Sequence, residues 1–308
     1  MNKSIECSIG VMAYNEGENI SHLLSALLSQ NTKIDDNKNI IIKEIIVVSS
    51  GSTDDTDKIV GEFAVKYDSV KLIKEPNRNG KSAAINLFIK HAISDILIVE
   101  SGDTIPHSEC VKNLIQPFYN FSISDYTDIG MTGGQPIPIN DKDDFICYTV
   151  KLLWKFHHQM ALFSPKLGEM IAFRKIFEKI PEQSAVDEAS IEAIIKENKL
   201  KCKYIPSAII YNKGPETLKD FIKQRKRIAI GHLWLKRKHK YSVSSNNIFI
   251  LINLFLFEAI KHPKDIFKLI MVAKLECFCR LLGYFDYYIK KSNPFIWDTI
   301  NSAKKLMD

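Results

Sequence analysis

The feature that most constrains the fold of this 308-residue chain is an alternation of apolar runs and helix-forming segments over its first hundred residues. Apolar runs at residues 7–13, 43–49, 70–74 and 95–100 are each followed by polar residues, and helical segments separate them. The Ile, Leu and Val content of these runs is typical of buried parallel strands. Strand–helix–strand order predicts a doubly wound α/β sheet whose polar turns collect at the carboxyl ends of the strands.

The other elements follow from periodicity and from turn residues. We expect further strands at residues 128–134, 170–173, 202–205 and 208–211. We expect helices at residues 18–30, 54–66, 80–92, 145–163, 187–197 and 217–235, and a polar loop at 31–39.

Bulk composition excludes several classes of protein. Apolar residues make up 45% and charged residues 25% of the chain, which is ordinary for a globular protein and argues against wholesale disorder. The six cysteines form no C-x-x-C pair, so we expect neither a zinc site nor a disulfide framework. The sequence shows no signal-peptide pattern, and unpaired cysteines suit a reducing compartment, so we expect a cytoplasmic location.

Positive charge is concentrated in one stretch of the sequence. Between Lys213 and Tyr241, ten Lys and Arg residues stand against two acids, in a chain whose net charge is +6. Such a stretch suits an anionic membrane surface or a phosphate-bearing substrate. Aromatic residues that stack on bases are sparse there, so we expect no nucleic-acid partner.

The composition changes again after Tyr241. Residues 242–247 read as a polar linker, and residues 248–260 and 266–289 are apolar with interspersed lysines. The first apolar run is shorter than the roughly 20 residues that span a bilayer, and charges interrupt the second. We predict amphipathic helices that lie on a membrane or pack on each other. The expected division of the chain is 1–240, with halves 1–106 and 107–240, followed by a C-terminal helical region at 241–308.

Four polar stretches occur in a fixed order along the first strands. They are residues 12–20 (MAYNEGENI), 45–56 (IIVVSSGSTDDT), 77–86 (NRNGKSAAIN) and 96–106 (ILIVESGDTIP). Their order and wording resemble the nucleotide-binding half of glycosyltransferase family 2, the inverting GT-A transferases. The resemblance, which extends over about residues 5–235, implies an α/β GT-A fold: a Rossmann-like mixed sheet flanked by helices, here with a C-terminal amphipathic helical appendage.

In that family a nucleoside-diphosphate sugar lies at the carboxyl ends of the first strands. The family segment usually written VVDDGSxDxT carries two aspartates where this chain has Ser49 and Ser50. Gly80 and Lys81 begin a helix, where backbone N–H groups, the helix dipole and an ammonium favour a diphosphate. For the first turn, helix capping is the alternative to a role in binding. The donor-binding residues that the resemblance implies are Ala13, Tyr14, Asn15, Glu16, Ser49, Ser50, Gly51, Asp54, Asn77, Gly80, Lys81, Ser101 and Gly102.

The fourth stretch stands where the family has its metal-binding DxD motif. Here Ser101 replaces the first aspartate, Glu100 precedes it, and Asp103 holds the second position. Carboxylates suit hard cations, so the resemblance implies Mg2+ or Mn2+ bridging the diphosphate, with Asp103 as a ligand.

The second half of the chain carries the motifs of the acceptor side. Residues 168–174 (GEMIAFR) resemble the family's strand beneath the acceptor, and residues 224–227 (QRKR) resemble its QxxRW element, with Ile228 in place of Trp. The residues that this implies near the acceptor or the diphosphate are Gly168, Glu169, Gln224, Arg225 and Arg227.

A carboxylate pair at the start of a helix completes the resemblance. Asp187 and Glu188 stand where the family has its ED pair, and an inverting transferase needs one carboxylate to take the proton of the acceptor hydroxyl. We favour Glu188 as this base, with Asp187 second. The alternative is that both residues only place favourable charge at a helix N-terminus.

Together these features predict a metal-dependent, inverting hexosyltransferase that acts by direct displacement. The expected acceptor is a lipid-linked glycan, a lipid or a polysaccharide, and the expected place is the inner face of the cell membrane, as a peripheral protein. One alternative is a non-catalytic subunit that binds a sugar nucleotide or glycan. A second, less favoured alternative is a nucleotidyltransferase, because residues 10–17 carry no basic phosphate loop.

Overall fold

The computed structural model describes residues 3–35, 38–120, 125–241, 248–296 and 298–306, so the linker expected at 242–247 lies outside the described residues. The strands are β1 Lys3–Ala13, β2 Lys33–Asp35, β3 Lys38–Ser50, β4 Val70–Glu75, β5 Ile96–Ser101, β6 Thr104–Pro106, β7 Tyr119–Asn120, β8 Asp125–Tyr126, β9 Ile129–Pro138, β10 Ile171–Arg174 and β11 Lys201–Asn212. The helices are α1 Ile20–Leu28, α2 Thr56–Lys66, α3 Lys81–His91, α4 Cys110–Ile115, α5 Phe145–Phe163, α6 Asp187–Glu197, α7 Leu218–His239, α8 Ile248–Lys261 and α9 Ile266–Tyr288.

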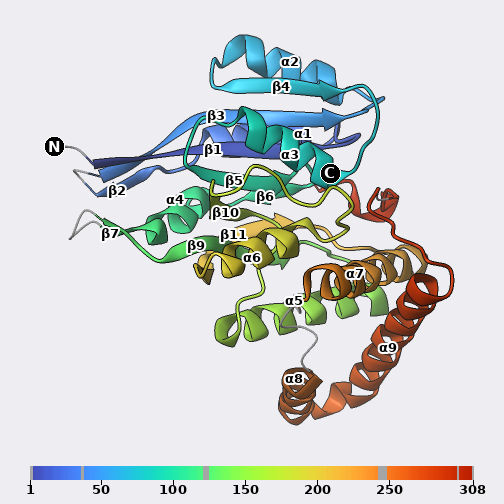
Figure 1. Ribbon diagram of the computed structural model, residues 1–308. Helices are drawn as coiled ribbons and strands as arrows, with labels where there is room; N and C mark the ends of the chain where they lie inside the picture. The colour runs from blue at the N-terminus through green and yellow to red at the C-terminus, as the bar shows by residue number, and fades with distance from the viewer. Residues whose placement is uncertain (1–2, 36–37, 121–124, 242–247, 297, 307–308) are drawn as a thin grey trace.

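One mixed sheet organises the molecule (Figure 1). Strands β4, β3, β1 and β5 are parallel neighbours, as the alternation of strands and helices predicts. Beyond β5 the sheet becomes mixed: β10 is antiparallel to β5 and to β9, and β11 runs parallel to β9 and antiparallel to β6. Because β5 pairs with β10, the two expected halves of residues 1–240 share this sheet.

Helices cover both faces of the sheet. On one face, Leu23 and Leu27 of α1 belong to a core with Ile9 of β1, which α2 and α4 extend. On the other face, Phe88 of α3 and Ile191 of α6 belong to a second core with strand residues of opposite orientation. Two apolar cores therefore enclose a central sheet, and the strand ends are left to form the site.

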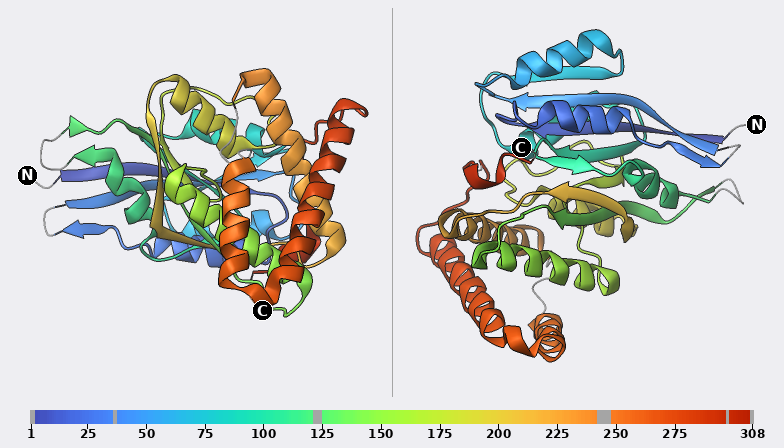
Figure 2. Two further views of the ribbon diagram at one scale, coloured as in Figure 1. Left: turned by 90° about the horizontal axis from the view of Figure 1, so that it is seen from below. Right: turned by 180° about the vertical axis from the view of Figure 1, so that it is seen from behind.

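The last helices lie at the edge of the molecule away from β4 (Figures 1 and 2). Helix α9 packs closely on α7, since a Cβ added to Gly283 would lie 2.7 Å from Cβ of Ala229. Helix α8 is tied to α5 by an ion pair of 2.6 Å between Lys155 Nζ and Glu258 Oε2. Among the described residues, no helix combines the length and the apolar character that crossing a bilayer requires.

Most expected elements are confirmed, and two expectations are wrong. The polar segment expected to be a loop contains β2, which pairs antiparallel with β3. The two short strands expected at 202–205 and 208–211 form the single strand β11, whose pairing with β9 shifts register between Tyr204 and Ile209. Pro206 lies inside that irregularity, where a missing backbone N–H is tolerated.

Candidate functional site

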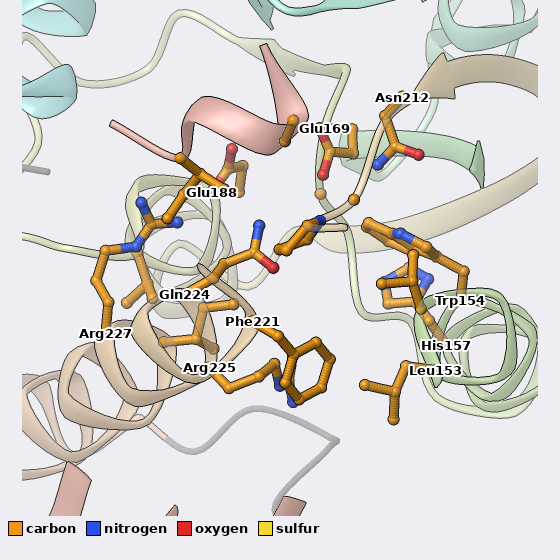
Figure 3. Close-up of a pocket in the computed structure, with 18 of the residues that line it drawn as sticks. Leu153, Trp154, His157, Glu169, Glu188, Asn212, Phe221, Gln224, Arg225 and Arg227 are labelled. Carbon is orange, nitrogen blue, oxygen red and sulfur yellow. The ribbon is translucent and has the colours of Figure 1, made fainter. Parts of the chain in front are cut away.

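A cavity of about 710 Å3 lies at the carboxyl ends of the parallel strands. Strand register brings the predicted turns together there: Ala13 is paired with Ser49, and Met12 with Ser101. The first residues of α3, the first half of α6, and side chains of α5, α7, α8, α9 and the chain after α9 also line it. Figure 3 shows labelled lining residues from α5, α6 and α7 facing one another across this space.

The predicted site residues divide into two groups by position. Those that line the cavity are Ala13, Tyr14, Glu16, Ser50, Gly80, Lys81, Ser101, Asp103, Gly168, Glu169, Glu188, Gln224, Arg225 and Arg227. Those that do not line it are Asn15, Ser49, Gly51, Asp54, Asn77, Gly102 and Asp187.

Several of the residues that do not line the cavity hold the first turns in place. Asn15 adopts a left-handed backbone conformation, with φ of 53°, and its side-chain oxygen accepts from the backbone N–H of Thr53 at 2.8 Å. The Asp54 carboxylate accepts from the backbone N–H of Gly17 at 2.9 Å. These bonds link the turn after β1 to the turn after β3. Gly51, with φ of 69°, allows a close approach, since a Cβ there would lie 2.9 Å from the backbone nitrogen of Arg78.

An arginine that the sequence did not single out lies beside the predicted donor-binding residues. The guanidinium carbon of Arg78 lies 3.8 Å from the centroid of the Tyr14 ring, and both residues line the cavity. Arg78 lies inside the stretch 77–86, but its contact with a ring 64 positions away is not visible in the sequence.

Carboxylates gather where β5 ends. Burial, together with the charge of Asp103, raises the pKa of Glu169 to about 7, and Glu169 has a left-handed φ of 59°. Burial, with smaller contributions from the charges of Glu169 and Asp103, raises the pKa of Glu100 to about 8. Strained backbone of this kind occurs at functional sites. The crowding of negative charge at this point is a setting that a cation would relieve.

These carboxylates fit a divalent cation in the manner of Mg2+, which is often held by one or two carboxylates and by substrate phosphates. Asp103 and Glu169 both line the cavity and carry hard oxygen ligands. Within the described part of the chain, no group of three or more His, Cys, Asp or Glu side chains forms a metal cluster by itself. A cation here would depend on oxygen atoms supplied by the substrate.

Lys81 joins the donor side to the predicted base. Its ammonium lies 2.7 Å from Glu188 Oε1 and 3.0 Å from Asp187 Oδ2. Burial opposes ionisation of Glu188, but the charge and hydrogen bond of Lys81 hold its pKa below the ordinary value. Burial and the neighbouring charge of Glu188 raise the pKa of Asp187. Only Glu188 lines the cavity, because Asp187 is fully buried behind it.

The basic motif on α7 divides between two ends of the cavity. Arg227 lies close enough to Asp187 and Glu188 that their charges act on its pKa, which burial lowers to about 10. Arg225 instead pairs with Glu276 of α9, at 2.6 Å between Nη2 and Oε1. Figure 3 shows Gln224 between these two arginines. The two arginines of this motif therefore lie in different environments.

The chain after α9 returns to the first turn, which the sequence did not predict. Lys304 Nζ donates to the carbonyl oxygens of Tyr14 at 2.7 Å and Asn15 at 3.0 Å, and it pairs with the carboxylate of Glu16. Burial is the main cause that raises the pKa of Glu16 to about 7, although Lys304 acts against it. This contact joins residues more than 280 positions apart, so no local pattern could have revealed it.

The architecture of the sheet and its helices first defines a class of fold, the GT-A fold. The structure is similar to that of the mannosyltransferase PcManGT from Pyrobaculum calidifontis, solved in complex with GDP-Man and Mn2+, with a TM-score of 0.57 and 17% identity over 94% of this chain and 81% of that chain. A solved mycobacterial protein gives a TM-score of 0.50 at 16% identity, over 76% of this chain and 74% of that one. The predicted GT-A fold is confirmed.

The family follows from the sequence match. The family model described as Glycosyl transferase family 2 matches residues 8–170. The chain belongs to glycosyltransferase family 2, as the motifs predict.

Curated relatives match parts of the chain. It is similar to the glycosyltransferase AglE of Haloferax volcanii, with 33% identity over 34% of this chain and 33% of that protein. It is also similar to the probable glycosyltransferase YdaM of Bacillus subtilis, with 26% identity over 63% of this chain and 49% of that protein. A dolichyl-phosphate beta-glucosyltransferase of Trichomonas vaginalis, ALG5C, is 30% identical over 30% of this chain and 28% of its own length. The chain thus spans about half or less of these relatives.

Proposed function

We propose that this protein transfers a sugar from a nucleoside-diphosphate donor to an acceptor hydroxyl, with inversion of the anomeric centre. The observation that carries this proposal is the contact of Lys81 with Glu188 at the wall of one cavity that Asp103 and Glu169 also line. This contact supports the proposal because Lys81 offers a cation to a departing diphosphate and Glu188 beside it offers a carboxylate to the acceptor. Membership of glycosyltransferase family 2 supports the same chemistry.

The donor is assigned to the ends of β1, β3 and β5. Tyr14, Arg78 and Ser50 line that part of the cavity and offer a ring, a guanidinium and a hydroxyl to a nucleoside. Gly80 precedes the first residue of α3 and lines the cavity, and Lys81 and the N-terminus of this helix suit phosphate oxygens. Asn15, Gly51 and the other predicted donor-binding residues that do not line the cavity would act by holding these turns.

The transfer is a single displacement. Glu188 takes the proton of the acceptor hydroxyl while its oxygen forms a bond to the anomeric carbon. The bond from that carbon to the donor phosphate breaks, and its electron pair leaves with the nucleoside diphosphate. Lys81 and Arg227 lie beside Glu188 and would offset the charge of the leaving group.

We assign Mg2+ or Mn2+ to Asp103 and Glu169. The mannosyltransferase with a similar fold was solved with Mn2+ and GDP-Man, and carboxylates at the end of β5 suit such an ion. When bound, the cation would supply charge stabilisation to the diphosphate. Ser101, in place of a carboxylate, adds only a weak ligand to this set.

We infer the acceptor and the cellular location from the C-terminal helices, which we propose as a region distinct from residues 1–240. Helices α8 and α9 expose large apolar side chains, among them Phe249, Ile260 and Phe267, beside lysines. This composition suits the surface of an anionic membrane. We therefore propose a peripheral protein at the inner membrane face, acting on a lipid-linked glycan, a lipid or a polysaccharide.

A donor panel tests the proposed function. UDP-, GDP-, dTDP- and CMP-sugars are each added with Mn2+ or with EDTA, and thermal stabilisation and release of free nucleotide are measured. We expect one donor to stabilise the protein only with Mn2+ and to be hydrolysed slowly, and D103A to lose both effects. No response to any donor would contradict a transferase and favour a subunit that only binds glycans.

A further inference from the structure

One end of the cavity is not required by the donor or by the base. Figure 3 shows Arg225, Phe221 and Leu153 on the side opposite Glu169 and Glu188. Lys166, His232 and Arg280 line the same cavity. The charges of Arg225 and Arg280 act on Lys166, whereas burial lowers the pKa of His232 well below its ordinary value, so His232 adds no charge. This end therefore joins a group of cations to the reaction centre through one continuous space.

The cations of this group outnumber the carboxylate that they share. Glu276 accepts from Arg225 Nη2 at 2.6 Å and Nε at 2.8 Å, and from Arg280 Nε at 2.9 Å. Lys166 forms no ion pair within 4 Å with any residue that the structure describes. The two guanidiniums thus share one carboxylate, and the second carboxylate that acts on Lys166, that of Glu192, is already paired with Lys196 at 2.7 Å. Positive charge is therefore in excess at this end of the cavity.

The charges of Glu276 and Glu192 offset only part of what burial and the neighbouring cations do to the pKa of Lys166. Burial, with the charges of Arg225 and Arg280, lowers the pKa of Lys166 to about 8. Burial also lowers the pKa of His157 to about 3, so this histidine is neutral at pH 7 and adds no charge of its own. A buried cation without a partner is costly, and a ligand that carries negative charge would remove that cost.

The wall beside the cations is apolar. It is formed by side chains from α5, α7, α8 and α9, and includes Leu153, Phe156, Phe221, Leu251, Phe255 and Leu269. Such a wall offers little to a free sugar or a free phosphate, whereas a hydrocarbon chain is stabilised by each CH2 group that it buries there. The surface therefore offers one region for an anion and an adjoining region for a chain.

We propose that this end of the cavity binds the lipid phosphate of the acceptor, with the phosphate at Lys166, Arg225 and Arg280 and the hydrocarbon chain along the apolar wall. This assignment of the lipid phosphate to the acceptor rests on the transfer function proposed above. Guanidinium and ammonium groups together suit phosphate oxygens. A lipid phosphate would then reach the site between α5, α7 and the hairpin of α8 and α9.

Binding of farnesyl phosphate to the full chain, without donor, tests this assignment. Calorimetric titrations below the micellar concentration use farnesyl phosphate, farnesol, inorganic phosphate and dihexanoyl phosphatidate. We expect farnesyl phosphate to bind at least tenfold more tightly than each of the others. Equal binding of farnesol would leave only an apolar pocket, and equal binding of inorganic phosphate would leave only an anion site. Tighter binding of the phosphatidate would identify a membrane headgroup, so each of these outcomes overturns the acceptor assignment.

Variants locate the site. K166M is expected to weaken farnesyl phosphate at least tenfold, to leave farnesol unchanged, and to melt no lower than the wild type, because it removes a buried cation without a partner. R280M is the second variant in case K166M fails to fold. K274M, which removes an exposed lysine of α9 outside the cavity, is the matched control and should bind as the wild type does. Unchanged binding in both K166M and R280M would contradict the assignment.

The donor panel separates this inference from the proposed function. K166M should keep the thermal stabilisation by the nucleotide sugar, since Lys166 lies outside the donor side. Transfer to a sugar without any binding of farnesyl phosphate would keep the function and reject the lipid phosphate. Binding of farnesyl phosphate without a response to any donor would reject the transferase instead.

Discussion

At the scale of single residues, Lys81 contacts both Glu188, the proposed base, and Asp187. Glu188 lines the cavity and Asp187 does not, so we expect the two carboxylates to have different tasks. We expect E188Q to lower kcat about a hundred- to ten-thousandfold with little change in the KM for the donor. Because Lys81 keeps the pKa of Glu188 low, the wild-type kcat should remain high at mildly acidic pH. Steady-state kinetics over a pH series checks both statements.

The control for this variant lies on the same helix. E197Q, at the exposed end of α6, should retain the wild-type rate. A fully active E188Q beside an inactive D187N would make Asp187 the base, and the assignment to Glu188 would be wrong.

A second residue-scale prediction concerns Glu100, which is fully buried and bonded to Thr104 Oγ1 at 2.9 Å. Its pKa is about 8 in the folded chain and near 4.5 when unfolded, so the folded state holds an extra proton between these values. Stability should therefore fall as pH rises through this window, by up to about 1.4 kcal/mol per pH unit from this group. E100Q should remove that slope when urea unfolding is followed in EDTA at several pH values.

Glu44 provides the opposite case for comparison. It is buried like Glu100, but hydrogen bonds from Lys71, Ile93 and Ser8 outweigh its burial and lower its pKa. Its contribution to stability is therefore present above pH 4.5, and E44Q should lose stability without a comparable change in slope. Equal slopes in E100Q and the wild type would show that Glu100 is ionised at neutral pH.

A contact between two residues could be predicted only where both belong to the ordered motifs along the first strands. The turn residues were found because their order along the first strands is fixed, and parallel pairing then brings Ala13 beside Ser49. The ring contact of Arg78 and the unpaired ammonium of Lys166 depend on segments that meet only in three dimensions. Residue identity gave the chemistry of the site, whereas its partners required the fold.

At the scale of elements, local signals set how well a boundary could be predicted. Helix α5 begins and ends at the expected residues, and its start has a local signal, since Asp144 caps it by accepting from the backbone N–H of Cys147 at 2.8 Å. Strand β2 was missed since three residues carry no measurable alternation, and its pairing with β3 is tertiary. Strand β11 was divided because Pro206 and Ser207 resemble a turn.

The hairpin of α8 and α9 yields a prediction at the same scale. Phe249, Ile260 and Phe267 are 75%, 81% and 72% exposed, and lysines lie near them. We expect the protein to sediment with vesicles that contain phosphatidylglycerol, less with pure phosphatidylcholine, and less at high salt. I260D combined with F267D should abolish sedimentation, because a charge in the apolar face prevents its insertion.

Val65 of α2 provides the control for the hairpin. It is 90% exposed and lies on a helix that packs beside β4, at the edge of the molecule away from α8 (Figure 1). V65D should sediment as the wild type does. Sedimentation of the double variant with anionic vesicles would place the membrane contact elsewhere.

At the scale of the whole molecule, the chain after α9 ties distant parts together. Ser302 Oγ donates to Asp220 Oδ2 of α7 at 2.7 Å, and Asn293 donates to the carbonyl oxygen of Gln183 at 3.0 Å. Lys304 then reaches the carbonyl oxygens of Tyr14 and Asn15. The last residues thus connect the acceptor side of the sheet to the donor side.

Removing the ammonium of Lys304 tests how much this connection contributes. K304M leaves Glu16, which is 6% exposed, without its cation, and it leaves two backbone carbonyls without a donor. We expect the free energy of unfolding to fall by about 1–3 kcal/mol, and trypsin to cleave the chain after α9 sooner than in the wild type. Thermal melting and timed proteolysis measure the two effects.

A double variant separates the charge of Glu16 from the backbone carbonyls. Because E16Q removes the carboxylate that K304M leaves without its cation, E16Q combined with K304M should recover part of the lost stability. It should recover none of the protection against trypsin, since the carbonyls stay without a donor. K291M removes an exposed lysine of the same segment, keeps Lys304, and should match the wild type in both assays. Wild-type melting and cleavage in K304M would mean that the other contacts of this segment hold the two sides together without it.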